Sequence, residues 1–217
     1  LENVRGFLDS DFDEYREHIF SEIKKLGYVT HIKLLNASDY GVPQLRPRVV
    51  IIGIRKDQRG AFEYPEKMPE NAPSVGSTLC DLMGKNGWKH AKQWAKDADK
   101  IAPTLVGGSK KHGGPDLGPT RAKKAWAELG VDGRGIANDA PDVGFEGMPR
   151  LTSRMMARIQ GFPDTWTFGE KKTAACRMIG NAFPPPVAKA VGEKIKECLE
   201  YGCADCKCEI SISQKAV

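Results

Sequence analysis

The residues best suited to chemistry stand in two charged motifs near the start of the chain and one polar motif near its end. Glu2-Asn3-Val4 offers a carboxyl group, and Gln44-Leu45-Arg46-Pro47-Arg48 offers two guanidinium groups just before an apolar run. Gly180-Asn181-Ala182-Phe183-Pro184-Pro185 follows much later. A carboxyl group can exchange protons with a substrate, and a guanidinium presents permanently charged donors in a fixed fork. Taken singly, each motif has a structural alternative: a surface Glu, a salt-bridged Arg pair beside a strand, and a turn that caps a helix.

The elements that position the first two motifs read as alternating helix and strand. The start of the chain resembles the end of a buried strand. Asp9 or Ser10 can cap a helix that ends at Gly27, along which Phe12, Tyr15, Ile19, Phe20, Ile23 and Leu26 recur at helical spacing. Residues 28–35 and 48–54 read as strands, with a loop at 36–44 between them. This order indicates an α/β fold, although the two strands around Pro43 could instead be antiparallel.

Residues 57–148 differ in character, because Gly and Pro are frequent and apolar periodicity is weak. Short helices are predicted near 77–83 and 88–94, and a short strand near 102–106. The run from 107 to 115 has no hydrophobic anchor and is predicted to be a loop. We interpret this region as a second, smaller lobe.

Regular structure is predicted again after Pro149. Thr152 can cap a helix that continues to about Gln160, and residues 172–179 read as another short helix. Pro184 to Pro186 can begin the last helix, since Pro is tolerated in a first turn. The buried face of that helix is expected to hold Val187, Val191, Ile195 and Cys198 or Leu199.

The basic residues are concentrated in the middle of the chain. There are 33 Lys and Arg against 28 Asp and Glu, a net charge of +5. Between Lys85 and Lys124, ten basic residues face three acidic ones, whereas the rest of the chain is nearly balanced. Such a segment suggests a polyanion partner, or else a solvated lysine-rich face. The 40% hydrophobic content supports a packed core and excludes wholesale disorder, and no apolar run is long enough for a transmembrane helix.

The six cysteines do not form a recognisable metal motif. Cys80 and Cys176 are isolated, and Cys198, Cys203, Cys206 and Cys208 crowd the C-terminus. Zinc sites usually need two separated ligand pairs, and here the second pair and any following His are missing. No metal is therefore expected, and 201–217 is interpreted as a reduced Cys-rich tail.

In their order and spacing, these motifs, together with the segment Arg150–Asp164, resemble the C-terminal half of the DNA (cytosine-5) methyltransferase family. The resemblance covers residues 1–55 and 149–200. It implies the C-terminal part of a Rossmann-like, S-adenosylmethionine-dependent α/β fold with a loop-rich target-recognition domain inserted. The implied domains are catalytic 1–56, target recognition 57–148, a return to the catalytic domain at 149–200, and the tail 201–217.

The resemblance also implies a reaction on a cytosine that has been flipped out of duplex DNA. A Cys thiolate adds to C6, and C5 then takes the methyl group of S-adenosylmethionine. Glu2 matches the carboxyl group that binds N3 and the exocyclic amine, which works best when it shares a proton in a buried site. Arg48 matches the group facing O2, and Arg46 the one that braces the catalytic loop and the DNA backbone. Gly180, Asn181 and Ala182 match positions beside the cofactor pocket.

Contacts with double-stranded DNA are expected mainly from the insert. The candidates are basic side chains that could reach phosphates or base edges: Lys110, Lys111, Arg121, Lys123, Lys124 and Arg134, with Arg154 from the scaffold segment as a further phosphate contact.

Two parts of the family pattern are not found in this sequence. The Gly-rich cofactor loop is missing, and no Cys follows a Pro, so no residue of this chain is assigned as the nucleophile. The chain is therefore expected to need an N-terminal half or a complementary subunit. A non-catalytic DNA-binding homologue and a tRNA cytosine-5 methyltransferase are the alternatives. Secretion is not indicated, and a cytoplasmic, nucleoid-associated location is expected.

Overall fold

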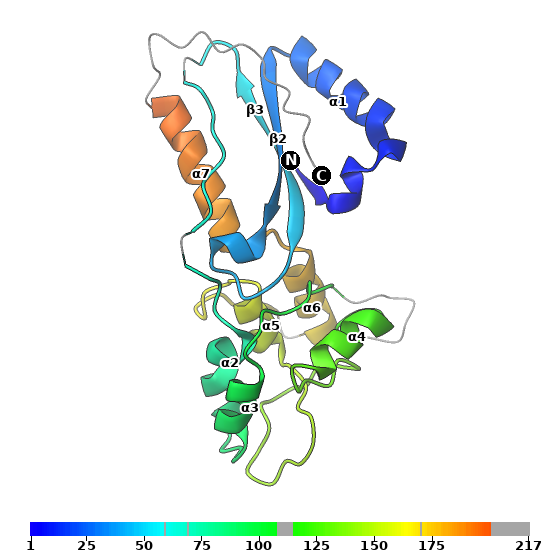
Figure 1. Ribbon diagram of the computed structural model, residues 1–217, viewed down its shortest axis with the longest axis vertical. Helices are drawn as coiled ribbons and strands as arrows, with labels where there is room; N and C mark the ends of the chain where they lie inside the picture. The colour runs from blue at the N-terminus through cyan, green and yellow to red at the C-terminus, as the bar shows by residue number, and fades with distance from the viewer. Residues whose placement is uncertain (59, 69, 108–114, 170, 201–217) are drawn as a thin grey trace. The chain divides into compact units, whose positions relative to one another are not determined.

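The computed structural model describes residues 1–58, 60–68, 70–107, 115–169 and 171–200 (Figure 1). Their contacts form two compact units. Of the described residues, the first unit contains Leu1–Lys33, Val49–Glu66 and Ala190–Glu200, and the second contains Leu34–Arg48 and Lys67–Lys189.

A three-stranded sheet runs through the first unit. Its strands are β1 (Glu2–Val4), β2 (Tyr28–Asn36) and β3 (Pro47–Arg55), in the spatial order β1-β3-β2. Leu1 and Ile51 exchange both backbone hydrogen bonds, at 2.8 and 2.9 Å, which is the pattern of an antiparallel pair. Lys56, just after β3, donates to the carbonyl of Gly27, just before β2. The β2–β3 pair is therefore antiparallel, which was one of the two arrangements left open by the sequence.

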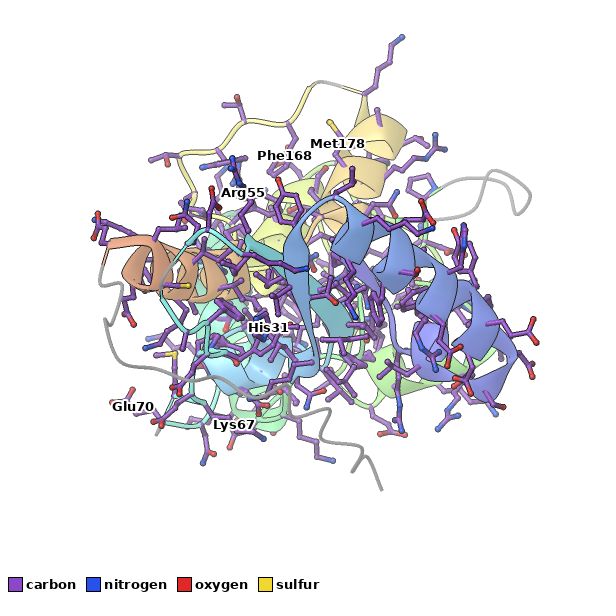
Figure 2. The ribbon with its side chains drawn as sticks, turned by 90° about the horizontal axis from the view of Figure 1, so that it is seen from above. His31, Arg55, Lys67, Glu70, Phe168 and Met178 are labelled. Carbon is purple, nitrogen blue, oxygen red and sulfur yellow. The ribbon has the colours of Figure 1, made fainter. Side chains whose placement is uncertain are left out.

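Helix α7 (Pro185–Glu200) covers one side of this sheet. Cys198 packs in a small apolar cluster with Ile54 of β3 and Phe62, and Ile195 borders that cluster. The predicted final helix and its apolar stripe are confirmed at these positions. The helix α1 lies on the opposite side of the strands in both views (Figures 1 and 2).

Helix α1 (Asp13–Lys25) differs from its prediction in two ways. Two 3-10 turns, η1 (Arg5–Leu8) and η2 (Ser10–Phe12), precede the helix, and neither Asp9 nor Ser10 caps it with its side chain. The helix buries none of its residues: Tyr15 is 59% exposed, and Leu26, just after it, is 76% exposed. The helical spacing is confirmed although its apolar side chains are not buried among the described residues, and Gly27, with φ 85°, ends the helix as predicted.

The segment after β3 is tied back to the sheet by aromatic side chains. The Tyr64 hydroxyl donates to the carbonyls of His31 and Val50, at 2.9 and 2.8 Å. The His31 ring, labelled on β2 in Figure 2, lies 5.2 Å from the ring of Phe62. Burial raises the pKa of Tyr64 and lowers that of His31.

The second unit is built from short helices around one core. They are η3 (Ala37–Tyr40), α2 (Val75–Gly84), α3 (Ala91–Asp97), α4 (Thr120–Ala127), α5 (Ser153–Ile159) and α6 (Lys172–Asn181). In α2, Val75, Leu79 and Met83 recur at helical spacing and are fully buried. Gly76 lies so close to α3 that a Cβ there would meet the carbonyl oxygen of Ala95 at 1.9 Å. The first two predicted insert helices are therefore confirmed, and they pack as a close pair.

The insert shares its core with the segment that follows it. Trp126 of α4 and Leu105 belong to the same buried cluster as Met156 of α5 and Ile179 of α6. The compact units group the described residues of 57–66 with the first unit and those of 149–189 with the second, and the domain bounds at 57 and 149 stay a prediction. Common burial of apolar side chains explains this grouping.

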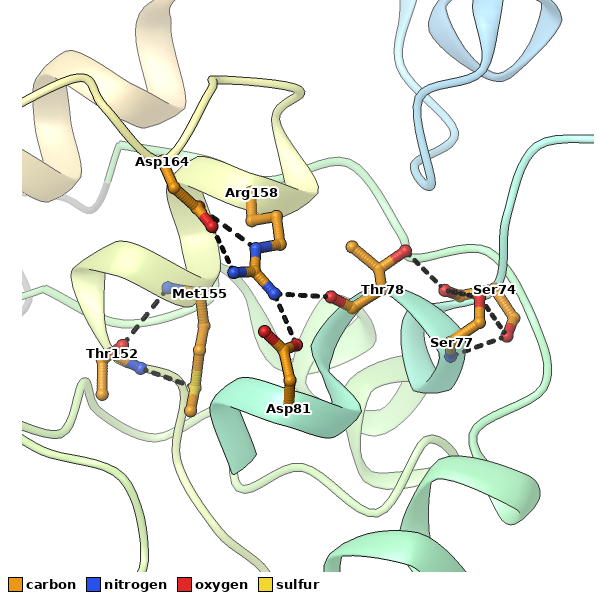
Figure 3. A network of polar contacts seen from close by, with 8 residues as sticks. All are labelled: Ser74, Ser77, Thr78, Asp81, Thr152, Met155, Arg158 and Asp164. Carbon is orange, nitrogen blue, oxygen red and sulfur yellow. Dashed lines mark hydrogen bonds and ion pairs between the residues drawn. The ribbon is translucent and has the colours of Figure 1, made fainter. Parts of the chain in front are cut away.

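An ion-paired arginine joins α5 to α2 within this unit (Figure 3). The Arg158 guanidinium contacts the carboxylates of Asp164 and Asp81 and donates to the Thr78 carbonyl at 3.2 Å. These contacts raise the pKa of Arg158 and lower the pKa values of Asp81 and Asp164. Thr152 caps α5 by accepting from the backbone N–H of Met155, as predicted.

Two other expectations have separate outcomes. Residues 102–106 do not form a strand, and their pairing with Gln44 is a single parallel bridge at Ala102. The helix predicted at 172–179 is confirmed as α6. Within the described ranges, no helix combines the length and the apolar character needed to cross a bilayer.

Candidate functional site

The two side chains expected to hold the base lie on β1 and β3. Glu2 is exposed in this chain, so the expected burial of its carboxyl group is not provided by the described residues. Arg48 is half-buried, and its guanidinium donates to the carbonyl of Pro47 at 2.8 Å. Glu2 belongs to the first compact unit and Arg48 to the second, so their convergence on one ring stays a prediction.

Arg46 lies inside the second unit and not at its surface. Its guanidinium is 1% exposed and donates to the carbonyls of Leu105 and Gly180, both at 2.7 Å, and of Ala182 at 3.1 Å. A guanidinium bound in this way joins two backbone segments, the one at Leu105 and the turn at Gly180–Ala182. Its buried position does not support the expected contact with a DNA backbone.

A pair of buried glutamines continues the same network. The Leu105 N–H donates to Gln44 Oε1 at 2.7 Å, and Gln44 Nε2 donates to Gln160 Oε1 at 2.7 Å. Gln160 Nε2 in turn donates to the carbonyl of Ala182 at 2.6 Å. Both glutamine side chains are fully buried. We refer to this chain of hydrogen bonds, from Leu105 through Gln44 and Gln160 to Ala182, as the amide relay.

The expected cofactor-side turn, Gly180-Asn181-Ala182, lies at the end of α6. Gly180 touches the backbone of another segment: a Cβ there would meet the nitrogen of Gly107 at 2.4 Å and the carbonyl carbon of Val106 at 2.5 Å. Only Gly permits this approach. A Cβ on Gly107 would likewise lie 2.8 Å from Asn181 Oδ1, so the Asn181 side chain occupies the space left by that glycine. Asn181 is otherwise exposed.

The expected DNA contacts have different surroundings. Arg121 and Lys124 are exposed on α4, three positions apart and hence on one face of the helix. Lys123 is half-buried and pairs with Asp116 at 2.7 Å. Lys110 and Lys111 lie outside the described residues.

Arg154 forms its hydrogen bonds within the scaffold segment in which it lies. Its guanidinium donates to the carbonyls of Pro163 and Trp166 and stands 5.8 Å from the ring centroid of Phe168. These contacts leave its proposed phosphate contact as a prediction.

Arg134 and Arg150 are both oriented by the buried carboxylate of Asp132. Arg134 Nε donates to one carboxylate oxygen and Arg150 Nε to the other, each at 2.9 Å. Hydrogen bonds from Arg134, supported by those from Arg150, hold the pKa of Asp132 well below its usual range. The Arg150 guanidinium also lies against the backbone of Gly135, where a Cβ would meet it at 3.1 Å. Two partly exposed guanidinium groups are thus fixed side by side on one loop.

Replacing Asp132 with Asn is expected to destabilise the protein by about 2 kcal/mol at pH 7, because two charge-assisted hydrogen-bond acceptors weaken together. The pKa of Asp132 is lower in the folded state, so this stabilisation is present above the unfolded value near 4 and is lost as pH falls through the folded value. Urea unfolding at pH 7 and pH 3 measures it. The difference in unfolding free energy between wild type and variant should be smaller at pH 3 than at pH 7. A larger difference at pH 3 contradicts the assignment. Asp139→Asn, at an exposed position nearby, is the matched control.

Two of the described cysteines do not resemble nucleophiles. Cys176 and Cys198 are buried, and burial raises the pKa of each thiol. No group of three His, Cys, Asp or Glu side chains that could hold a metal ion occurs among the residues described. Cys203, Cys206 and Cys208 lie outside them.

Known proteins identify the class of this chain. Residues 1–197 match the C-5 cytosine-specific DNA methylase family, and the chain belongs to that family. It is 54% identical over 202 residues to Type II methyltransferase M.NaeI of Lentzea aerocolonigenes, covering 92% of this chain and 49% of that protein. It is 48% identical over 203 residues to Type II methyltransferase M.NgoMIV of Neisseria gonorrhoeae, covering 92% and 64% respectively. The chain thus spans about half to two thirds of the length of these relatives.

A solved structure supports the fold alone. A mutant of DNMT2 from Spodoptera frugiperda superimposes with a TM-score of 0.53 at 15% sequence identity, over 92% of this chain and 65% of that one. The α/β class predicted from the sequence is confirmed, and so is the resemblance to cytosine-5 methyltransferases.

The sequence reasoning missed two groups of polar residues. Gln160 and the partnership of Asp132 with Arg150 were not among the predicted site residues. Their only signal in the sequence is position: Gln160 ends a predicted helix, and Asp132 stands in a Gly-rich stretch. Buried hydrogen-bond partners far apart in sequence cannot be recognised from spacing.

Proposed function

We propose that this chain is the C-terminal portion of a type II DNA (cytosine-5) methyltransferase. The match of residues 1–197 to the family carries this proposal. The amide relay and Arg46 support it, since they join the Gln44–Arg48 motif to the Gly180–Ala182 motif inside one folded unit. Both of the relatives described above are named as type II methyltransferases, which favours a role beside a restriction enzyme.

Glu2 and Arg48 are proposed to hold the flipped cytosine. Leu1 pairs with Ile51 in an antiparallel register, which sets Glu2 opposite Val50 on β3. Arg48 precedes Val50 by two residues, and side chains two apart on a strand project from the same side. The match to the family supports a common substrate for the two side chains. A carboxyl group at N3 and a guanidinium at O2 would neutralise the negative charge that develops when a thiolate adds to C6.

S-adenosylmethionine is proposed as the cofactor, and it supplies the methyl group when bound. The close backbone packing of Gly180 against Val106 and Gly107 fits such a neighbour, because it fixes Asn181 at an exposed turn. Asn181 and Ala182 would border the pocket. The rest of the pocket is proposed to come from a part of the enzyme outside this sequence.

That other part is proposed to supply the nucleophilic Cys and the Gly-rich cofactor loop. The first unit exposes large apolar side chains that a soluble protein normally covers: Leu1, Val4, Phe12, Tyr15, Leu26, Val29 and Ile32. The relatives continue well beyond the length that this chain matches. An N-terminal half of the same protein, or a complementary subunit, would cover this surface. Below, "complete enzyme" means this chain together with that part.

Duplex DNA is proposed as the substrate. Support comes from the exposed cations of the insert, namely Lys85, Lys89, Lys92, Lys96, Lys100, Arg121 and Lys124, and from the guanidinium pair on Asp132. Lysines of this kind give salt-dependent affinity for phosphates, whereas arginines held in place can read bases.

Methyl transfer by the complete enzyme tests this function. Duplex DNA and tRNA are each incubated with methyl-labelled S-adenosylmethionine, and bisulfite sequencing then locates the modified cytosines. We expect label in DNA at C5 of cytosine within one short sequence. Label in tRNA alone favours the tRNA alternative, and DNA binding without methylation favours the non-catalytic one.

A further inference from the structure

The Asn181 turn is held from behind by side chains that do not belong to any predicted site. The carbonyls on both sides of Asn181 are engaged: that of Gly180 by Arg46, and that of Ala182 by both Arg46 and Gln160. The last carbonyls of a helix lack partners within the helix and carry partial negative charge, so a buried guanidinium suits them. Asn181 therefore sits between two anchored peptide groups.

The direction of the amide relay is determined by its ends. The Leu105 N–H can only donate, and the Ala182 carbonyl can only accept. Gln44 must then turn its oxygen toward Leu105 and its nitrogen toward Gln160, and Gln160 must turn its nitrogen toward Ala182. A reversed amide at either position would set two donors or two acceptors against each other. Because both side chains are fully buried, water offers no replacement partner.

The relay also begins inside the insert, at Leu105. Leu105 is bound at both of its backbone groups, since Gln44 takes its N–H and Arg46 takes its C=O. The same Arg46 guanidinium reaches the Gly180 carbonyl. A displacement of Leu105 is therefore transmitted to the Asn181 turn by two buried routes. One runs through Gln44 and Gln160, and the other through Arg46.

We propose that Gln160 is a positioning residue for the cofactor: with Gln44 and Arg46 it fixes the Gly180–Ala182 turn so that Asn181 meets S-adenosylmethionine in its binding orientation. This inference rests on the proposed function. Gln160 acts through the Ala182 carbonyl, which it holds at 2.6 Å, and does not touch the substrate ring. Its loss should weaken cofactor binding in the ground state and in the transition state alike, which raises KM and leaves kcat nearly unchanged.

Gln160→Glu in the complete enzyme separates the two bonds of this side chain. A carboxylate still accepts from Gln44 but cannot donate to Ala182, so only the last link of the relay is broken. We expect the Kd for S-adenosylmethionine, measured by titration calorimetry, to rise roughly tenfold, a usual size for coupling between groups that are not in contact. KM for the cofactor should rise in parallel, with kcat and the Kd for DNA within about twofold of wild type.

Controls distinguish positioning from general destabilisation. Gln93→Glu makes the same chemical change at an exposed position of α3 and should leave the cofactor Kd unaltered. Gln160→Met removes both bonds of Gln160 and should weaken cofactor binding at least as much as Gln160→Glu. Wild-type hydrogen exchange supplies a readout that needs no variant: cofactor addition should protect the peptides around 105 and 180–182 together.

The proposal is overturned if Gln160→Glu or Gln160→Met lowers the melting temperature while the cofactor Kd stays at the wild-type value. It is also overturned if cofactor protects neither region in hydrogen exchange, which decides the matter if both variants fail to fold. A wild-type enzyme that binds S-adenosylmethionine but methylates no DNA would instead contradict the proposed function, so the two failures are distinguishable.

Discussion

Glu2→Gln in the complete enzyme is expected to lower kcat by about 10²- to 10⁴-fold, the usual contribution of a positioned acid or base. An amide can still hydrogen-bond a pyrimidine edge, but it cannot share a proton with N3 as thiolate addition places charge in the ring. Binding of duplex DNA should survive, because Glu2 would contact only the flipped base. Single-turnover methyl transfer and a DNA titration at one fixed salt concentration measure the two effects.

Glu14→Gln is a suitable control for this change, since Glu14 lies exposed in the first turn of α1. It should leave turnover at the wild-type level. Equal turnover for Glu2→Gln and wild type would remove Glu2 from the mechanism. A loss of DNA binding as large as the loss of turnover would assign Glu2 to folding or to docking of the complementary part.

Arg48→Ala is expected to reduce kcat by about 10²- to 10³-fold, as removal of one donor to a developing oxyanion does. Arg48 is half-buried and already held by the Pro47 carbonyl, so its guanidinium is pre-oriented before the base arrives. Arg48→Lys should recover only part of the rate, because an ammonium group lacks the planar fork. Pre-steady-state methyl transfer at saturating DNA measures the chemical step.

Non-specific DNA affinity and its salt dependence should stay near wild type in Arg48→Ala, since the side chain is assigned to the base and not to a phosphate. Arg55→Ala, at the far end of β3, is the matched control because Arg55 pairs with nearby Asp57 in an exposed position. An unchanged kcat in Arg48→Ala contradicts the assignment. So does a decrease of a full unit in the slope of log binding constant against log salt concentration.

The elements with strong local signals were predicted well from the sequence. β3 is a near-continuous apolar run, and α5 begins at a Thr with capping geometry, so local physics alone fixes them. Helix α1 was predicted as a helix, but its lack of buried residues was not foreseen. Its apolar spacing is helical, but Tyr15 meets only the edge of the Phe7 ring among the described residues and stays 59% exposed. Periodicity does not state what lies opposite a face.

The sequence predicted the motifs that form the candidate site, but not the hydrogen bonds that connect them. Arg46 was expected to brace the catalytic loop and the DNA backbone, and its guanidinium is buried against backbone carbonyls at 105, 180 and 182. Gln160 was not a candidate, because its partners Gln44 and Ala182 are 116 positions before it and 22 after it. Pairings across such separations are decided by packing, which spacing along the chain does not encode.

The core shared by the insert and the following helices has a consequence for protein engineering. A recognition region that buried its own apolar side chains could be exchanged between relatives as an independent cassette. Here three insert residues interact with residues outside the insert. Trp126 shares a core cluster with Met156, Asp81 forms an ion pair with Arg158, and the Leu105 N–H donates to Gln44. A chimera joined at 57 and 148 would separate each of these pairs, so grafts that keep 34–48 and 149–189 together with the donor insert are the ones expected to fold and to carry a new sequence preference.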